Sequence, residues 1–274
     1  MSDSRIAFLG AGNMGRALIS GLLRSGRRPE HISVGETQPV ARAALLRELG
    51  IAALDDNHAV ISDAAVVVLA VKPQDLKSVL APLTAQLAAA RPLVVSVAAG
   101  VRTPTLESWC GAGVPVVRAM PNRPALIGAG ATGLYAPARV DAAARAKAEQ
   151  LLRAVGAVAW VPDEEALDVV TALSGSGPAY FFLLAELMAE AGEQLGLAAG
   201  TARRLAAATL YGAGLLTQSD DCDLARLRAE VTSPGGTTEA ALRVFVDAGL
   251  RETVRTALAA AAQRSRELAD AAVG

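Results

Sequence analysis

The sequence predicts an α/β domain with a doubly wound, mostly parallel sheet, followed by an all-helical domain. Three observations support this fold class. Short apolar runs alternate with helical stretches over roughly the first 160 residues, a glycine-rich turn joins the first run to the first helix, and only helical periods follow Pro162. We therefore expect a dinucleotide-binding domain at residues 1–162 and a helical domain at residues 163–274.

The strands of the first domain are expected where short apolar runs are flanked by turn residues. A continuous apolar run such as 65–70 is typical of a strand covered on both faces. The expected strands are Ile6–Leu9, His31–Val34, Ala65–Ala70, Leu93–Val97, Val114–Ala119, Gly130–Tyr135 and Ala157–Val161. The expected helices are Gly15–Ser25, Val40–Leu49, Leu76–Ala90, Thr105–Cys110 and Val140–Val155. This βαβ alternation implies right-handed crossovers.

The second domain shows helical periods alone. Its expected helices are Glu164–Thr171, Pro178–Leu195, Thr201–Thr217, Leu224–Glu230, Thr238–Ala248 and Arg251–Ala272. Apolar side chains nearly encircle 201–217, and a helix that is apolar on all sides is a buried one. Because roughly 110 residues enclose little interior, we expect a second copy of the chain to cover these helices in a homodimer.

Composition excludes several classes of protein. The 274 residues are 52% hydrophobic, carry 26 basic and 27 acidic side chains, and contain only 3% aromatic residues. This balance argues against a nucleic-acid-binding surface, and the aromatic residues are too few for base stacking. Cys110 and Cys222 have no metal-ligand spacing and are expected to be reduced. With a polar start at Met1–Ser4 and no uninterrupted apolar stretch of about 18 residues, we expect a cytoplasmic protein without a signal peptide or membrane association.

The turn after the first strand fits the pattern G-x-G-x-x-G of Rossmann domains. It reads Gly10, Ala11, Gly12, Asn13, Met14 and Gly15, and it opens a helix, as the pattern requires. Gly10 permits the tight turn, Gly12 lets the backbone approach a pyrophosphate, and Gly15 lets the helix pack closely on the strand. The positive end of the helix then faces the phosphates.

An acidic residue ends the second expected strand. Glu36 follows Gly15 at about the 20-residue spacing at which a carboxylate accepts hydrogen bonds from the ribose 2′-OH of NAD. A carboxylate there should repel the 2′-phosphate of NADP. Two alternatives stay open: the side chain of Glu36 points to solvent, or Arg42 reaches a 2′-phosphate.

Five further motifs give the chain a family resemblance. Ala70–Pro73, Ser96–Gly100 and Arg118–Asn122 each end an expected strand, and Ser174–Tyr180 and Thr232–Thr238 lie in the helical part. Together with the glycine loop, this set resembles the pyrroline-5-carboxylate reductase family, and Ser-Pro-Gly-Gly-Thr-Thr at 233–238 is its most diagnostic part. The resemblance covers essentially the whole chain.

The resemblance implies an activity and an assembly. The activity is hydride transfer from NADPH or NADH to the imine carbon of 1-pyrroline-5-carboxylate, which gives L-proline in the last step of proline biosynthesis. The implied assembly is a homodimer with interlocking helical domains, often built further into a ring, so that one site can draw on two chains. Arg123 and Ala229 depart from the family pattern, which usually has threonine and aspartate at these positions.

The resemblance also implies site residues. The cofactor-binding residues expected from the motifs are Gly10, Ala11, Gly12, Asn13, Met14, Gly15, Glu36, Asn57, Ala70, Val71, Lys72, Pro73, Val97, Ala98 and Ala99. The expected substrate-binding residues are Glu164, Ser176, Ser233, Gly235, Gly236, Thr237 and Thr238. Thr238 is the expected catalytic residue, and no metal site is expected.

The residues of the diagnostic motif also make chemical sense by themselves. Ser233–Gly236 is a turn that leads into a helix, and free N–H groups at a helix start bind anions such as a carboxylate. An ordinary turn with a threonine N-cap is the alternative. No general acid or base stands out, because His31 and His58 both lie in the first domain. Imine reduction needs no strong acid, so we expect catalysis to depend mainly on proximity and orientation.

Two other functions remain as alternatives. A dehydrogenase of 3-hydroxy acids would present a catalytic lysine in the helical domain, whereas Lys72, Lys77 and Lys147 all precede Pro162. A non-enzymatic NAD(P) sensor would need the glycine loop but not the 233–238 motif.

Overall fold

The computed structural model describes residues 4–218 and 222–271. Its contacts divide the chain into two compact units, Met1–Gly175 with Ala261–Gly274, and Ser176–Ala260. The sequence places a boundary earlier, after Pro162. The difference arises because α8 (Ala166–Val170), just after Pro162, packs on β7 (Gly130–Tyr135) of the first unit. The end of the last helix likewise contacts Asp168 and Gly100 of that unit.

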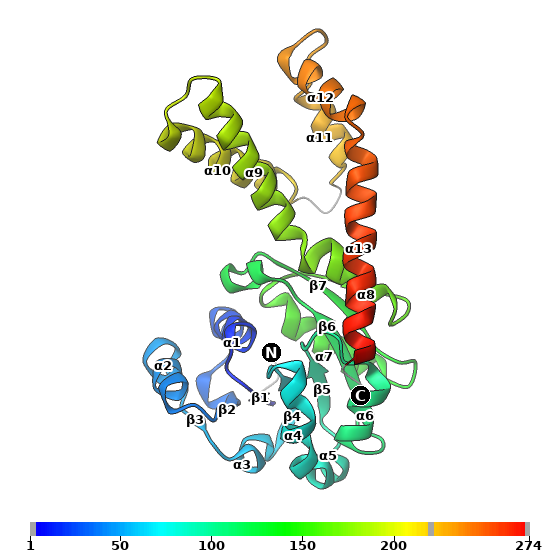
Figure 1. The fold of residues 1–274 in the computed structure, drawn as a ribbon. Coiled ribbons are helices and arrows are strands. Elements are labelled where there is room, and N and C mark those ends of the chain that lie inside the picture. Colours follow the sequence, from blue (N-terminus) through cyan, green and yellow to red (C-terminus); the bar gives the residue numbers. More distant parts are fainter. Residues whose placement is uncertain (1–3, 219–221, 272–274) are drawn as a thin grey trace. The chain divides into compact units, whose positions relative to one another are not determined.

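The first unit is built on one sheet of eight strands in the order β3-β2-β1-β4-β5-β6-β7-β8 (Figure 1). The strands are β1 Arg5–Leu9, β2 Ile32–Gly35, β3 Ala53–Leu54, β4 Ala64–Leu69, β5 Leu93–Ser96, β6 Val116–Met120, β7 Gly130–Tyr135 and β8 Gly156–Trp160. Neighbouring strands pair in parallel, except β6 and β7, which pair antiparallel. The predicted doubly wound, mostly parallel sheet is therefore confirmed.

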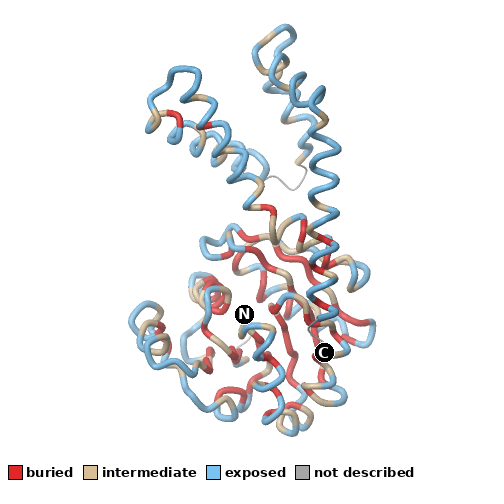
Figure 2. Tube along the Cα trace, in the orientation of Figure 1, coloured by how far each residue is buried: buried red, intermediate tan, exposed pale blue. Residues whose placement is uncertain are grey.

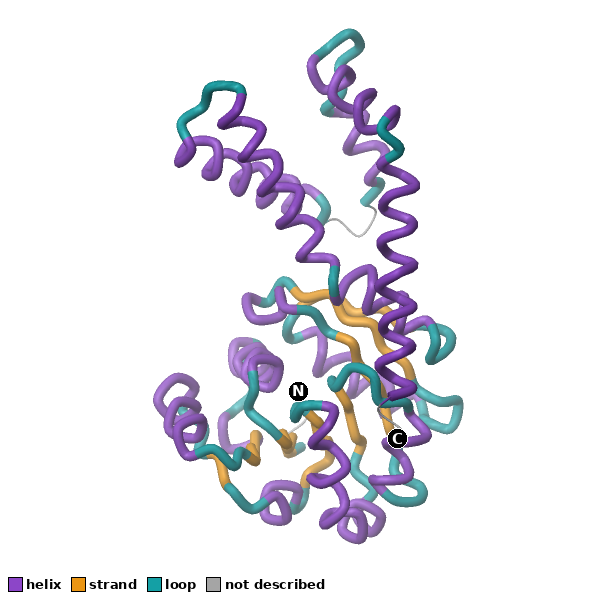
Figure 3. The backbone as a smooth tube through the Cα atoms, viewed as in Figure 1, coloured by secondary structure: helices purple, strands orange, loops and turns teal. Residues whose placement is uncertain are grey.

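Helices connect these strands, as the colours of Figure 3 show. They are α1 Asn13–Arg24, α2 Pro39–Leu49, α3 Asn57–Ile61, α4 Leu76–Leu80, α5 Thr84–Ala90, α6 Thr103–Cys110, α7 Ala142–Arg153 and α8 Ala166–Val170, the last continued by a π-helix at Thr171–Gly175. The single helix predicted at 76–90 is divided by a 3₁₀ turn at Ala81–Leu83, because Pro82 has no N–H to continue the helix. The short β3 and α3 were not predicted.

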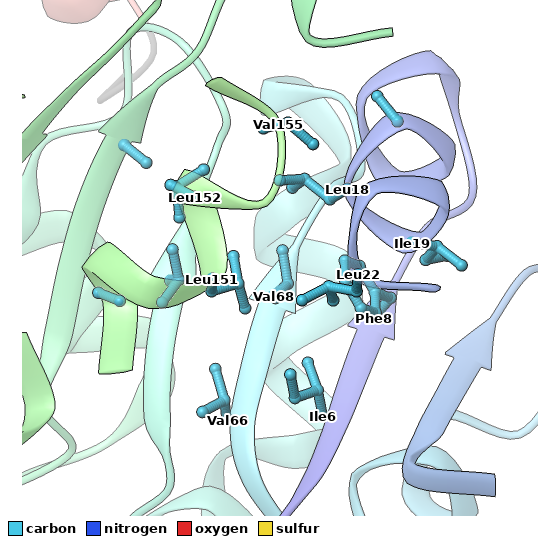
Figure 4. Packing of buried hydrophobic residues seen from close by; sticks show 14 of the residues in the cluster. Ile6, Phe8, Leu18, Ile19, Leu22, Val66, Val68, Leu151, Leu152 and Val155 are labelled. Atoms are coloured by element: carbon cyan, nitrogen blue, oxygen red, sulfur yellow. The ribbon is translucent and has the colours of Figure 1, made fainter. Parts of the chain in front are cut away.

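Apolar side chains bury both faces of the sheet. Along β1, Ile6 and Phe8 belong to one cluster, and Ala7 and Leu9 belong to the other. Figure 4 shows the first cluster, in which Leu18 and Leu22 of α1 and Leu151 of α7 pack around Phe8 and Val68. Buried positions accordingly follow the strands in Figure 2. This two-sided burial explains why the central strands appear in the sequence as unbroken apolar runs.

The two cysteines are free thiols. Cys110 is fully buried at the end of α6. Burial, with a smaller contribution from the Glu107 carboxylate, raises the pKa of the Cys110 thiol to about 12. This thiol therefore stays protonated and unreactive at neutral pH.

The second unit is helical. It contains α9 Gly177–Gln194, α10 Ala199–Leu216, α11 Leu224–Glu230, α12 Thr237–Asp247 and the first part of α13 Leu250–Ala271, whose turns from Ala261 onward belong to the first unit. The predicted helix end at Ala272 lies outside the described residues. Many large apolar side chains of this unit are exposed: Phe181, Phe182, Leu183, Leu184, Leu187, Met188, Leu205, Tyr211, Leu215, Leu216, Val244, Phe245 and Val246. Such a surface is typical of an interface between subunits.

Candidate functional site

The glycine loop has no room for other residues at two positions. Gly10 has φ +97°, and a Cβ atom there would lie 2.8 Å from Val71 Cγ1 and 2.9 Å from the carbonyl carbon of Ala70. A Cβ atom on Gly15 would lie 2.6 Å from the carbonyl oxygen of Gly10. The tight turn and the close approach of α1 to β1 therefore both require glycine.

The start of α1 is open toward a ligand. Gly12 is the N-cap of α1, has no side chain to cap the helix, and is exposed together with Asn13. The loop follows β1, which lies between β2 and β4, where the strand order reverses. Open α/β sheets bind ligands at this point, and the free N–H groups of a helix start suit a pyrophosphate. The residues present thus fit a dinucleotide.

The carboxylate of Glu36 turns back toward the glycine loop. Its Oε2 accepts a hydrogen bond from the Ala11 N–H at 3.1 Å, and its Oε1 accepts one from the Gln38 N–H at 2.9 Å. Arg42 is held close by, since its Nη1 donates to the carbonyl oxygens of Glu36 at 2.9 Å and Thr37 at 3.0 Å. The structure therefore places the carboxylate, and not the guanidinium, against the loop.

The other predicted cofactor residues follow parallel strands at the same edge of the sheet. Ala70–Pro73 follow β4, and Val97–Ala99 follow β5. The Val97 N–H donates to the Leu69 carbonyl oxygen at 3.1 Å, which holds the two strand ends together. Asn57 begins α3, and its side chain lies against the end of β2. Its Oδ1 atom occupies the space that a Cβ atom on Gly35 would fill. The structure thus brings these residues to the edge that carries the glycine loop.

Asn122 has a structural role that the sequence did not reveal. Its Nδ2 donates to the Ser174 carbonyl oxygen at 2.9 Å, and its Oδ1 accepts from the Ala131 N–H at 2.8 Å. The first bond ends in the π-helix, and the second ends in β7. Asn122 therefore ties the π-helix, a kind of segment often found at functional sites, to the sheet. Its position in the motif 118–122 was the only available signal.

Glu164, predicted to bind substrate, lies in a buried polar network. Its Oε1 accepts hydrogen bonds from the Thr103 N–H at 2.6 Å, from Thr103 Oγ1 at 2.9 Å and from Arg118 Nη1 at 2.6 Å. The side chains of Arg118 and Glu164 are only 7% and 12% exposed. This oxygen of Glu164 is therefore engaged within the first unit, and a role in substrate binding stays a prediction.

The diagnostic motif forms a turn that leads into α12. Gly235 has φ +68°, and Gly236 is the N-cap of the helix. The Gly235 N–H donates to Glu239 Oε2 at 2.8 Å, and the Gly236 N–H donates to the Ser233 carbonyl oxygen at 3.0 Å. Because these two groups are engaged and the first helical hydrogen bond comes from the Ala240 N–H, the N–H groups at Thr237, Thr238 and Glu239 are the donors left for an anion.

The predicted substrate residues do not all belong to one unit. Glu164 lies in the first unit, whereas Ser176, the N-cap of α9, and 233–238 lie in the second. Thr238 is half-buried in the first turn of α12, and Thr237 beside it is exposed. Within the described residues, no group of acidic, histidine or cysteine side chains could hold a metal ion.

Comparison with known proteins decides the family. A model described as pyrroline-5-carboxylate reductase dimerisation matches residues 164–268, and one described as NADP oxidoreductase, coenzyme F420-dependent, matches residues 5–100. The pyrroline-5-carboxylate reductase of Pseudomonas aeruginosa is 49% identical over 98% of each chain. The chain belongs to the pyrroline-5-carboxylate reductase family. The pyrroline-5-carboxylate reductase of Haemophilus influenzae is 41% identical, again over 98% of each chain.

Solved structures agree with this assignment to the pyrroline-5-carboxylate reductases. The enzyme of Coxiella burnetii superimposes with a TM-score of 0.94 at 43% identity, covering 97% of this chain and 99% of that one. A Plasmodium falciparum pyrroline carboxylate reductase with NADP bound superimposes with a TM-score of 0.82 at 26% identity, covering 98% and 99%. The dimerisation model begins at residue 164, next to the boundary predicted after Pro162.

Among the residues that the structure describes, one run of helix in this reductase-family chain has the length and composition of a membrane span. It covers Ala166–Gln194. The most apolar 18 residues of this run have a mean hydropathy of 1.3, and 22% of these residues are buried. No membrane span was predicted from the sequence, because that prediction required about 18 apolar residues without interruption. The run lies within the match to the dimerisation model, and contact between subunits is a sufficient reason for its apolar surface.

Proposed function

We propose that this protein reduces 1-pyrroline-5-carboxylate to L-proline with NADPH or NADH as the reductant. The observation that carries the proposal is the turn at 233–236, which leaves the first N–H groups of α12 available to the carboxylate of the substrate. Family membership and the glycine loop at the start of α1 support the same activity. A non-enzymatic NAD(P) sensor would have no use for this second anion site.

The glycine loop would hold the pyrophosphate of the cofactor through backbone N–H groups at the start of α1, and the strand ends at 70–73 and 97–99 would hold its nicotinamide half. When bound, the reduced nicotinamide supplies the hydride. The residues of this chain need only exclude water and orient the two reactants.

Thr238 would orient the substrate ring. With the carboxylate held by the N–H groups of Thr237 and Thr238, the hydroxyl of Thr238 can donate a hydrogen bond to the ring nitrogen or accept one from it. Such a bond would stabilise the amine as it forms. The histidines offer no alternative acid, because His31 precedes β2, at the opposite end of that strand from the cofactor residues, and His58 Nδ1 pairs with Gln86 Oε1 at 2.9 Å.

A turnover assay tests the function and the preference between cofactors together. The wild type should oxidise NADPH or NADH only when 1-pyrroline-5-carboxylate is present, and absence of turnover with both cofactors would refute the proposal. Glu36→Ser should shift the ratio of kcat/KM toward NADPH, because a carboxylate beside a 2′-phosphate costs about 1–3 kcal/mol as an unpaired like charge.

Glu30→Ser is the matched control for this experiment. Glu30 is exposed, precedes β2 and pairs with Arg28 at 3.5 Å, so its removal changes the net charge equally without altering the cofactor edge. The ratio should be that of the wild type in the control. An unchanged ratio in Glu36→Ser would show that Glu36 does not contact the ribose.

We further propose that the homodimer uses the exposed helices of the second unit and that dimers associate into a ring. Obligate interfaces resemble a protein core cut in half, which is the character of the exposed side chains on α9 and α10. Sedimentation should give at least a dimer at low micromolar concentration, and a larger even-numbered species would support the ring. A folded, active monomer would contradict both. We expect this assembly in the cytoplasm, without nucleic acid or membrane.

A further inference from the structure

The loop between β5 and α6 lies at the edge of the sheet that carries the glycine loop. It comprises residues 97–102, which follow Ser96, the last residue of β5, and precede Thr103, the first residue of α6. Its first three residues, 97–99, are those proposed to hold the nicotinamide half of the cofactor. Gly100 has φ +76°, a backbone conformation that favours glycine. The conformation of this loop therefore bears on how the cofactor binds.

Among the described residues, this loop makes few hydrogen bonds of its own. Its first residue is fixed, because the Val97 N–H donates to the Leu69 carbonyl oxygen of β4 at 3.1 Å. The next N–H group, at Ala98, makes only a long hydrogen bond of 3.4 Å to Ser96 Oγ. Within the part of the chain that the structure describes, the N–H groups of residues 99–100 donate to no protein acceptor. Contacts at the far end of the loop are therefore needed to hold its shape.

Two carboxylates hold that far end. Arg102 Nη2 donates to Asp168 Oδ2 of α8 at 2.8 Å. Thr103 donates to Glu164 Oε1 twice, through its N–H at 2.6 Å and through its Oγ1 at 2.9 Å. Hydrogen bonds in which a partner is charged are shorter and stronger than those between neutral groups. The end of the loop is therefore fixed by α8 and the turn before it.

Asp168 also holds the helix end that packs beside the loop. Its Oδ1 accepts a hydrogen bond from Ser265 Oγ of α13 at 2.7 Å. One turn further along α13, the backbone nitrogen of Ala269 would lie 3.7 Å from a Cβ atom on Gly100. All of these residues belong to the first unit. Asp168 thus contacts both the residue that ends the loop, Arg102, and the helix that packs against the middle of the loop.

The surroundings of Asp168 suit it to hold this loop and not to bind a ligand. Both of its carboxylate oxygens are engaged, one by Arg102 and one by Ser265, and its side chain is only 4% exposed. A loop that is ordered before binding costs less free energy to bind than one that becomes ordered during binding. A residue that fixes the loop therefore raises the affinity for the cofactor without touching it.

We propose that Asp168 is a positioning residue for the cofactor. By binding Arg102 and Ser265, it holds residues 97–100 in the conformation that accepts the nicotinamide half. This role rests on the proposed function, which assigns that half of the cofactor to residues 97–99 and 70–73. Loss of Asp168 then weakens binding of the nicotinamide half, while the glycine loop still binds the pyrophosphate.

Asp168→Ala tests the proposal, with NADH and ADP as probes. NADH contains the nicotinamide half, whereas ADP has only the adenosine and pyrophosphate. We expect the dissociation constant for NADH, from nicotinamide fluorescence, to rise about 5- to 20-fold, as it does if the loop keeps its binding conformation in about 5–20% of the molecules. The dissociation constant for ADP, from calorimetry, should stay within about twofold, because ADP does not contact the loop. If NADPH binds more tightly than NADH, the 2′-phosphorylated forms of both probes replace them.

Two variants accompany this test. Asp168→Asn can still accept from Arg102 through its amide oxygen and donate to Ser265 through its amide nitrogen, so its affinity for NADH should stay within about threefold of the wild type. Asp141→Ala is the matched control. Asp141 is exposed and caps α7 by accepting from the Ala144 N–H at 2.7 Å, at the edge of the sheet away from the glycine loop. Its loss should lower stability but leave both dissociation constants unchanged.

The outcomes that would overturn the proposal are distinct. Unchanged affinity for NADH in Asp168→Ala would overturn it, and so would equal weakening of NADH and ADP, which indicates a general loss of structure. If circular dichroism shows that Asp168→Ala does not fold, Arg102→Gln replaces it, because the Arg102 side chain is 21% exposed. The same rise for NADH is expected there, and unchanged affinity would overturn the proposal. Failure of the proposed function would differ, because the wild type would then bind NADH without reducing 1-pyrroline-5-carboxylate.

Discussion

Thr238→Ala should lower kcat/KM for 1-pyrroline-5-carboxylate by roughly 3- to 150-fold. The variant would remove the proposed hydrogen bond to the ring nitrogen, which would contribute about 0.5–1.5 kcal/mol if both partners are neutral and about 1.5–3 kcal/mol if the imine is protonated. The backbone N–H groups that would hold the carboxylate remain. Steady-state kinetics at saturating cofactor would measure the loss.

The matched variant for this prediction is Thr238→Ser, which keeps the hydroxyl and should keep most of the activity. Cofactor affinity should barely change in either variant, because the glycine loop belongs to the other compact unit. Full activity of Thr238→Ala would remove the hydroxyl from the mechanism. Capture of the carboxylate by backbone N–H groups would then be the main contact of the substrate with the turn.

Arg118→Met should lower the free energy of unfolding by about 3–5 kcal/mol, since removing one partner of a buried ion pair leaves the other charge without compensation. Glu164 would keep its hydrogen bonds from Thr103 but lose the guanidinium, in a place where its side chain is 12% exposed. Urea unfolding followed by circular dichroism would measure the change. The double variant Arg118→Met with Glu164→Gln should recover most of the loss, because no unpaired charge remains and the amide oxygen can still accept from Thr103.

Arg153→Met is the control, because it makes the same substitution at an exposed position. Arg153 pairs with Glu149 four residues earlier on α7, and its side chain is 65% exposed. An exposed pair of this kind contributes about 0–1 kcal/mol, so the control should unfold almost as the wild type does. Equal losses in the two single variants would contradict the interpretation that burial makes the pair at Arg118 important.

Local patterns in the sequence determined most of the strands, the glycine loop and the order of the two domains. The loop could be predicted because local geometry already requires two of its glycines: Gly10 has φ +97°, and a Cβ atom on Gly15 would meet the carbonyl oxygen of Gly10. The end of β4 at Ala70 and Val71 adds a further constraint on Gly10. The central strands could be predicted because burial on both faces makes them continuous apolar runs. The diagnostic motif 233–238 gave the family, which the comparison with known reductases confirmed.

Only the tertiary structure decided which polar residues meet. Asp168 and Ser265, or Arg118 and Glu164, are far apart in the sequence, and neither pair forms a pattern that a single chain reveals. Likewise, the two residues of β3 are too few to show a periodic pattern in the sequence. The antiparallel pairing of β7 with β6 depends on how the strands meet in the folded sheet. Secondary structure and glycine turns follow from interactions between near neighbours, whereas buried ion pairs and the docking of α13 depend on contacts that exist only after the chain has folded.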